Sequence, residues 1–297
     1  MNSLELINKL YKPYRITKLS KCTIIDSMDG SFIIKPKGEK DINELYNYLK
    51  SRGFNAFPDI IDESRSDVNI FEYIHEIEYP KEEKAIDMIK LVSSLHAKTS
   101  YEKSVTEDKF KEIYVNIDSN LVYYKDEYNH YIDEFEGEVF MSPSHYLFIR
   151  NASKLLNQIA FCKTKLDEWY ASVKDKKTTR VALVHNNLQL DHFIKGEKEV
   201  LLSWDKAVRD SPILDIYNLY QREALNLEFS SLMELYKKHY PLNQDEFDLL
   251  LIMLCMPHKI TFDDNEFRSC EAIQKELDYV FKTEELVRPY YLKDDTK

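Results

Sequence analysis

Short runs of β-branched and aromatic residues, separated by turn residues, dominate the first 75 positions of the chain. Such runs are typical of strands, because branched side chains pack well on a pleated surface. They predict strands over residues 14–19, 21–27, 31–36, 59–63 and 68–74. Met28-Asp29-Gly30 separates the second run from the third and has the composition of a hairpin turn. The pattern therefore predicts a small antiparallel sheet.

Helical spacing interrupts the strand pattern between the third run and the fourth. The apolar positions recur at i, i+3, i+4 and i+7: Ile42, Leu45, Tyr46 and Leu49. Residues 41–44 have the form of an N-terminal capping box, and Gly53 offers a C-terminal stop. One helix is therefore predicted over about residues 41–52.

Beyond Pro80 the apolar positions follow helical spacing. One apolar face predicts an amphipathic helix over residues 81–99: Ala85, Met88, Ile89, Val92, Leu95 and His96. Helical periodicity returns over residues 152–170, 216–224, 230–239, 244–256 and 264–288. The fold class is therefore expected to be α+β, with a sheet-containing lobe over residues 1–76, a large helical lobe over 77–297 and a hinge at 75–80.

Composition narrows the choice of partners and compartment. The chain has 297 residues, 43% of them hydrophobic, and a formal net charge of −11 with dispersed Lys and Arg. This charge distribution does not favour nucleic acid or an anionic membrane as a partner. The four cysteines are far apart and form no CxxC pair, and the N-terminus lacks an apolar targeting segment. A cytoplasmic protein without nucleic-acid or membrane partners is expected.

Candidate chemistry is concentrated in residues 181–215. The loop His185-Asn186-Asn187-Leu188-Gln189-Leu190-Asp191-His192 is followed by the apolar segment 201–207 and by Pro212-Ile213-Leu214-Asp215. This order resembles the aminoglycoside and choline phosphotransferase family, whose loop reads HxDxxxxN and whose metal strand reads (I/V)D(F/W) before a Pro-x-x-Asp segment. The resemblance implies a protein-kinase-like, two-lobed fold with an antiparallel-sheet N-lobe and a helical C-lobe. The chain from Leu121 onward is most similar to the spore-coat kinase-like branch.

The resemblance also shows which family groups are replaced. Asn187 stands at the position of the catalytic Asp, His192 at that of the metal-binding Asn, and Ser203 at that of the metal-binding Asp. An amide cannot accept a proton from a substrate hydroxyl as a carboxylate can. Neither a hydroxyl nor an imidazole is a good ligand for Mg²⁺, which prefers charged oxygen. The active site is therefore predicted to be degenerate, with Mg²⁺ binding weak or absent.

Two acidic residues are candidate substitutes for the missing ligands. Asp205 lies two positions after Ser203, so both side chains would share one face if residues 201–207 formed a strand. Asp191, beside His192, is the second candidate. An exposed acid near a turn is the simpler interpretation of both.

The remaining family positions have functional and structural interpretations. Lys35 matches the lysine that contacts nucleotide phosphates and is expected to face residues 185–203 across a cleft, although a lysine at a solvated sheet edge is common. Its expected carboxylate partner is Glu39 or Glu44, and the sequence does not distinguish them. The phosphate-covering loop is expected near residues 19–23, which contain no glycine.

The resemblance assigns structural roles to His185 and Asp215, because in the family both support the catalytic loop whether or not phosphate is transferred. His96 has two interpretations, which are packing beneath that loop and direct chemistry. A histidine on the buried face of a helix is more often structural.

Two functional hypotheses follow. The first is a catalytically impaired, pseudokinase-like protein that acts by binding a nucleotide, another small molecule or a protein partner. The second is an active ATP-dependent phosphotransferase, a kinase of a small hydroxylated substrate with relocated acidic residues. ATP is the cofactor that the resemblance implies, and whether the protein is an enzyme is the question that separates the hypotheses.

Overall fold

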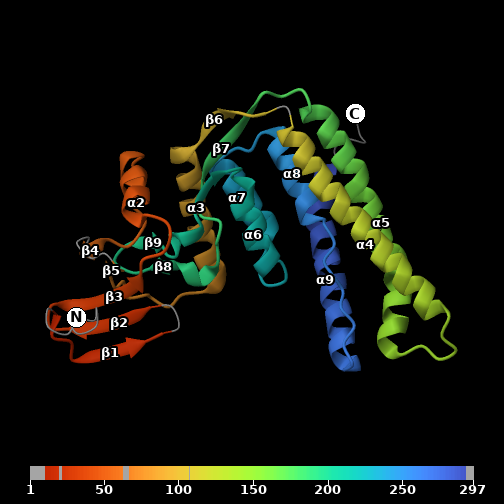
Figure 1. Cartoon of the computed structure of the whole chain (residues 1–297), viewed down its shortest axis with the longest axis horizontal. Helices are drawn as coiled ribbons and strands as arrows, with labels where there is room; N and C mark the ends of the chain where they lie inside the picture. The colour runs from red at the N-terminus through yellow and green to blue at the C-terminus, as the bar shows by residue number, and fades with distance from the viewer. Residues whose placement is uncertain (1–10, 20–21, 63–66, 107, 292–297) are drawn as a thin grey trace. The chain divides into compact units, whose positions relative to one another are not determined.

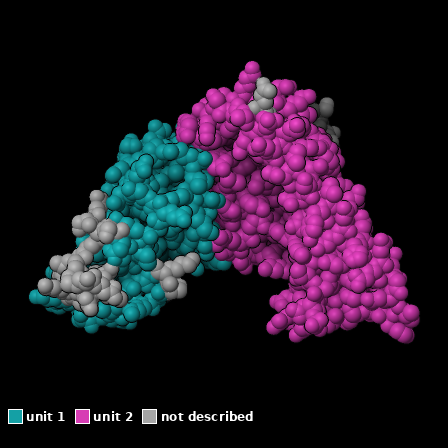
Figure 2. Space-filling model, viewed as in Figure 1, with its two compact units in different colours: residues 1–100, 182–209 teal, residues 101–181, 210–297 magenta. Residues whose placement is uncertain are grey.

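The chain divides into two compact units, and the computed structural model describes residues 11–19, 22–62, 67–106 and 108–291. The first unit combines residues 1–100 with 182–209, and the second combines 101–181 with 210–297 (Figure 2). Each unit therefore contains two separate stretches of the chain. The boundary between residues 1–76 and 77–297 stays a prediction, because these units group the catalytic-loop segment with the first hundred residues.

The first unit contains the predicted antiparallel sheet. Its strands are β1 (Arg15–Lys18), β2 (Thr23–Ser27), β3 (Gly30–Pro36), β4 (Ile60–Asp62) and β5 (Val68–Glu72), arranged in the order β1-β2-β3-β5-β4 (Figure 1). Gly30 closes the hairpin between β2 and β3 with φ +129°, a conformation that a residue with a Cβ rarely adopts. The predicted strands are thus confirmed, each to within a few residues at its ends.

Two helices of this unit also form where apolar periodicity predicts them. They are α2 (Ile42–Ser51) and α3 (Lys81–Thr99). Asp41 caps α2, because its carboxylate accepts hydrogen bonds from the backbone N–H groups of Asn43 and Glu44. The apolar face of α3 is buried, with Met88, Val92 and Leu95 each 0% exposed.

A short hairpin from the later stretch of the chain completes the first unit. It consists of β8 (Phe193–Lys195) and β9 (Glu199–Leu201), which pair antiparallel. Backbone hydrogen bonds attach this hairpin to the N-terminal residues, from Ile77 N–H to Lys195 O at 2.8 Å and from Leu201 N–H to Ala56 O at 3.0 Å. Residues separated by more than a hundred positions are therefore held together within one unit.

Gly196, in the turn between β8 and β9, packs directly against backbone. A Cβ at this position would lie 2.2 Å from the carbonyl oxygen of His75 and 3.0 Å from Ile74 Cγ2. Gly196→Ala is expected to lower the free energy of unfolding by about 1–3 kcal/mol, because the backbone must shift to relieve the overlap. Thermal unfolding measures the loss. Gly38→Ala is the matched control, since nothing lies within 4 Å of its added Cβ, and an equal loss in both variants would contradict this prediction.

The second unit is helical. Its helices are α4 (Lys109–Glu136), α5 (Pro143–Val173), α6 (Ile213–Glu223), α7 (Phe229–His239), α8 (Gln244–Leu254) and α9 (Glu266–Tyr291). The longest two, α4 and α5, run side by side as a hairpin (Figure 1). Pro143 begins α5 and Ser142 caps it, nine residues before the periodicity detected in the sequence. The predicted helices are confirmed, and α5 is longer than predicted.

Short strands lie where the chain passes from one unit to the other. Within the second unit, β6 (Tyr101–Ser104) pairs antiparallel with the first residues of β7 (Thr178–Val184). The chain then enters the first unit inside β7, directly before His185, and β10 (Val208–Asp210) precedes its return to the second unit. β6 is exposed along its whole length and has no apolar alternation, so no local pattern predicts it.

Candidate functional site

The catalytic-loop segment begins at the buried end of β7. Leu183 N–H donates to Thr99 Oγ1 at 3.1 Å, and this hydroxyl donates to Leu95 O at 2.7 Å, so the C-terminus of α3 fixes the strand end. His96, one helical turn before the end of α3, is 0% exposed. A completely buried imidazole cannot contact a substrate in this conformation, which favours the structural interpretation of His96.

His185 joins the start of the loop to the segment that follows β9. Its Nε2 lies 2.7 Å from Leu202 O, and because a carbonyl can only accept, Nε2 must carry the proton. The ring packs edge-on against Trp204 at a centroid distance of 4.9 Å. His185 is 0% exposed. Its position agrees with the structural role that the family resemblance implies.

His192 closes the loop onto its own backbone. Its Nδ1 donates to Asn187 O at 2.8 Å, while Gln189 Nε2 donates to Asn187 Oδ1 at 3.3 Å. Nδ1 is therefore engaged within the loop. Asn187 and His192 are therefore joined by a hydrogen bond. They stand at the positions of the family's catalytic Asp and metal-binding Asn.

The segment after β9 differs from the predicted strand over residues 201–207. The strand ends at Leu201, Ser203 has φ +62° and ψ +53°, and residues 204–206 form a 3-10 turn. Trp204 stabilises this turn, since its buried indole Nε1 donates to Leu201 O at 2.7 Å. The prediction of a strand is thus wrong beyond Leu201. Strand alternation therefore cannot place Ser203 and Asp205 on one face.

The turn nevertheless places Asp205 and Ser203 in one small pocket with Lys35. The cavity measures about 50 Å³ and lies wholly within the first unit; its polar lining residues are Lys35, Tyr46, Asn69, Ser203 and Asp205, together with the indole of Trp204. Lys35 reaches it from β3, where it pairs with Asn69 of β5. Lys35 therefore shares a pocket with Ser203, whereas residues 185–192 do not line it, and the expectation that Lys35 faces the whole region 185–203 stays a prediction. Ligand pockets commonly measure about 300–1,000 Å³, so this cavity could hold only part of a nucleotide.

The two charged residues that line this pocket, Lys35 and Asp205, form no ion pair with each other. Among the described residues, no carboxylate lies within 4.0 Å of the Lys35 ammonium, so neither Glu39 nor Glu44 is its partner in this structure. Glu44 instead lines a separate cavity with Lys40 and Asp41. Burial chiefly, and then the negative charges of Asp205 and Asp59, raise the pKa of the Tyr46 hydroxyl. Asp205 is therefore within electrostatic reach of the same pocket.

Comparison with solved structures identifies the architecture. An aminoglycoside phosphotransferase from Alicyclobacillus acidocaldarius superposes on 97% of this chain and 94% of its own, with a TM-score of 0.70 and 9% identity. The chain has an aminoglycoside phosphotransferase fold. The AMP-bound spectinomycin phosphotransferase APH(9)-Ia covers 96% of this chain and 92% of its own, with a TM-score of 0.52 and 13% identity. The predicted fold class, α+β and protein-kinase-like, is thereby confirmed.

Comparison at the level of sequence found no match. No model of a protein family matches the chain, and no curated protein matches it in sequence. At 9–13% identity the structural likeness establishes the fold alone. Individual site roles and the assignment to the spore-coat branch stay predictions.

The other predicted site residues do not line the Lys35 pocket. Asp191 is exposed on the 3-10 turn at Leu190–His192 and does not line the pocket. Of the two candidate substitutes for the missing metal ligands, Asp205 is therefore the one that lines it. Asp215 is 0% exposed in the first turn of α6, in the second unit, and its role stays a prediction. The predicted phosphate-covering loop at residues 19–23 includes positions 20 and 21, which are outside the described residues.

Three residues that shape this site are not among the predicted site residues. Tyr46, Asn69 and Trp204 line the pocket. Tyr46 and Trp204 are also buried aromatic residues of the core, and Asn69 is also a residue of β5, so none of them indicates a site by itself. Trp204 was the detectable signal, since a large aromatic residue directly before Asp205 favours burial with a hydrogen-bond partner for its indole N–H. Among the described residues, no three His, Cys, Asp or Glu side chains cluster as metal ligands, and no helix is long and apolar enough to cross a membrane.

Proposed function

We propose that this protein is a catalytically impaired phosphotransferase homologue that binds a nucleotide or another phosphate-bearing small molecule through Lys35. The observation that carries the proposal is the pocket shared by Lys35 and Ser203. A half-buried ammonium without a carboxylate partner among the described residues is a ready ligand for a phosphate oxygen. The same cavity presents a hydroxyl where the family has its metal carboxylate.

The residues at the metal positions do not fit Mg²⁺. Ser203 offers a neutral hydroxyl and His192 offers nitrogen, and His192 Nδ1 already donates to the loop backbone. Mg²⁺ prefers charged oxygen ligands in nearly octahedral geometry. Nucleotide binding through Lys35 should therefore depend little on the metal.

Asn187 removes the proton acceptor as well. Its amide can orient a hydroxyl by hydrogen bonding, but it cannot carry the negative charge that favours proton removal. Gln189 Nε2 already occupies one lone pair of Asn187 Oδ1 at 3.3 Å. Binding without efficient phosphoryl transfer is the function that these groups support, and a small-molecule partner fits this pocket better than a protein partner.

One observation favours the alternative of an active kinase of a small hydroxylated substrate. Of the described residues that line the Lys35 pocket, Asp205 is the one acid, and it is exposed and available to a ligand. In this alternative Asp205 supplies the charge that Ser203 lacks. The two functions differ in whether Mg²⁺ strengthens nucleotide binding through Asp205.

Calorimetric titration of ATP, with and without Mg²⁺, tests both functions. We expect weak binding that changes less than about twofold with Mg²⁺, and an approximately tenfold weaker affinity in Lys35→Ala, because one charge-assisted hydrogen bond is lost. Lys37→Ala removes a neighbouring exposed charge and is the matched control.

Two further variants decide the role of the acid. In the proposed function Asp205→Asn changes little, and Ser203→Asp creates a Mg²⁺ enhancement that the wild type lacks. A wild-type enhancement that disappears in Asp205→Asn but persists in Asp191→Asn would establish the alternative. Unchanged affinity in Lys35→Ala would contradict the phosphate site itself.

A further inference from the structure

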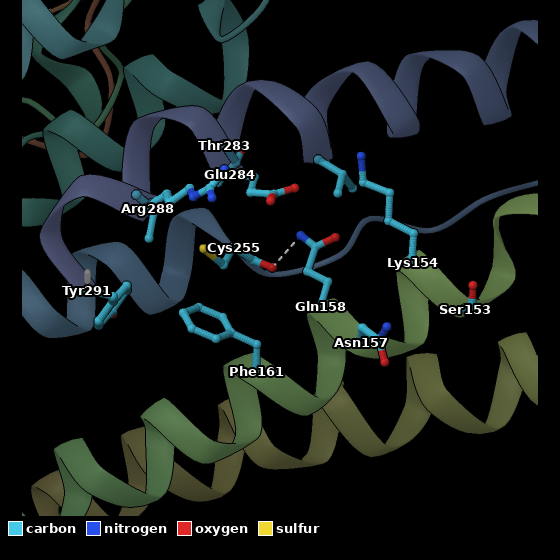
Figure 3. Close-up of a pocket in the computed structure, with 12 residues that line it drawn as sticks. Ser153, Lys154, Asn157, Gln158, Phe161, Cys255, Thr283, Glu284, Arg288 and Tyr291 are labelled. Carbon is cyan, nitrogen blue, oxygen red and sulfur yellow. Dashed lines mark hydrogen bonds between the residues drawn. The ribbon is translucent and has the colours of Figure 1, made fainter. Parts of the chain in front are cut away.

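The second unit contains a larger cavity, between α5 and α9, that has no part in the proposed function. Its volume is about 730 Å³, within the range of small-molecule pockets. Figure 3 shows Gln158 and Phe161 of α5 and Glu284, Arg288 and Tyr291 of α9 directed into the space between the two helices. Cys255, at the end of α8, forms part of the floor. None of these residues belongs to the Lys35 pocket.

Two buried polar atoms in this groove have no hydrogen-bond partner among the described residues. They are Gln158 Oε1 and Tyr291 Oη. Gln158 Nε2 donates to Cys255 O at 2.7 Å, which fixes the amide orientation and leaves Oε1 as the acceptor (Figure 3). Buried polar atoms normally find partners. A bound molecule with an N–H or O–H donor would satisfy Gln158.

Apolar and aromatic side chains form much of the wall. Phe161 and Tyr291 pack edge-on with ring centroids 5.2 Å apart, and Val280 and Val287 of α9 add aliphatic surface. Both valines are buried, at 4% and 2% exposure. Such a wall favours an aromatic ligand, because rings bury a large area and pack edge-on or offset against other rings.

The charged residues at the groove are net positive. Lys154 and Arg288 contribute two cations and Glu284 one carboxylate, in a protein whose formal net charge is −11. Glu284 and Arg288 are four residues apart on α9, yet they form no ion pair within 4.0 Å. Arg288 has no ion-pair partner among the described residues. A local positive lining in an acidic protein favours an anionic ligand.

We propose that this groove is a second ligand site that binds an amphipathic aromatic anion carrying a hydrogen-bond donor. The aromatic body packs against Phe161 and Val287, the donor bonds to Gln158 Oε1, and the anionic group lies toward Arg288 and Lys154. This site lies within the second unit and its ligand differs in kind from a nucleotide. Its occupancy therefore does not depend on the proposed function.

Fluorescence titration with anilinonaphthalene sulfonate tests the site, because this probe has an aromatic body, an N–H donor and an anionic group. We expect saturable binding of one probe per chain. Phenylnaphthylamine, which has the same body and donor without the sulfonate, should bind more weakly. The N-methylated sulfonate probe lacks the donor and should also bind more weakly, which tests Gln158 without altering the protein.

Variants locate the binding. Arg288→Ala should weaken the anionic probe about threefold, since the charge is exposed at the rim, and the double variant Lys154→Ala/Arg288→Ala about tenfold. Neither variant should change the affinity of the neutral probe. Phe161→Ala should weaken both probes. Arg268→Ala removes an exposed arginine from the same helix outside the groove and is the matched control.

Each outcome of these titrations bears on the proposal. Equal affinities for the sulfonate probe, its N-methylated form and the neutral amine would show that the groove selects neither charge nor donor, which refutes the proposed ligand. Probe binding that no groove variant weakens, or that Arg268→Ala weakens equally, would place the binding elsewhere and refute the site. Circular dichroism of Arg288→Ala should match the wild type, because the substituted side chain is exposed.

Discussion

Replacing Asn187 and Ser203 together by aspartate is expected to raise Mg²⁺-dependent ATP turnover from a very slow or undetectable wild-type rate. Each carboxylate is expected to contribute a factor of order 10²–10³, the effect typical of one charged or hydrogen-bonding group at a transition state. The wild type should accordingly transfer phosphate to sugars, aminoglycosides, choline or protein hydroxyls slowly or not at all.

The local backbone accommodates both substitutions. Ser203 lies in the left-handed region with φ +62°, where aspartate is among the residues that occur more often than average. Asn187→Asp preserves size and keeps an oxygen in place to accept the bond from Gln189 Nε2. Neither side chain is completely buried, so the new charges remain partly solvated. The gain in turnover should therefore not be offset by a large loss of stability.

Coupled measurement of ADP release, with Mg²⁺ and without an acceptor, detects this gain before any substrate is identified. Lys35→Ala in the doubly substituted protein should remove most of it, while Asp191→Asn in the same protein should not. One result for the wild type would contradict these roles. Ordinary kinase rates in the wild type, abolished by Lys35→Ala, would show that the roles assigned to Asn187 and Ser203 are wrong.

Local sequence patterns predicted most elements of this fold, because their information is repeated along each element. The helix α3 has five apolar residues and His96 on one face, and its predicted bounds agree with the structure. β6 has four exposed residues and no apolar alternation, so its pairing with β7 depends on a partner about 75 positions away. Such pairing leaves no local signal.

Motif order predicted which candidate site residues come together, whereas backbone conformation could not be predicted. Lys35 and Ser203 line one pocket as the family resemblance implied. The left-handed Ser203 was not foreseen, since serine has no special preference for positive φ, and the turn is stabilised by the indole of Trp204. The sequence did not distinguish Glu39 from Glu44, and in this structure neither carboxylate lies within 4.0 Å of the Lys35 ammonium.

Within the second unit, Glu246 joins the first residues of β7 to α8. Its carboxylate accepts from Arg180 Nε at 3.0 Å and also from Arg180 Nη2, so the pair is bidentate. Arg180 lies on β7, and Glu246 lies in the first turn of α8, where it also accepts from Asn243 N–H at 2.8 Å and completes a capping box. Glu246 is 6% exposed, so solvent cannot replace these bonds.

Glu246→Ala is expected to lower the free energy of unfolding of the second unit by about 3 kcal/mol, because it leaves the Arg180 guanidinium partly buried without its carboxylate and removes the Glu246 half of the capping box of α8. Glu246→Gln should lose about half as much, since its amide oxygen can still accept from Asn243. The protein contains two tryptophans, and Trp169 donates to Asp245 O at 3.0 Å, beside Glu246. Denaturant unfolding followed by Trp169 fluorescence in a Trp204→Phe background therefore reports this region. Glu168→Ala breaks an exposed ion pair with Lys165 and should cost less than about 1 kcal/mol; an equal loss in Glu246→Ala would mean that the buried pair contributes no more than a surface one.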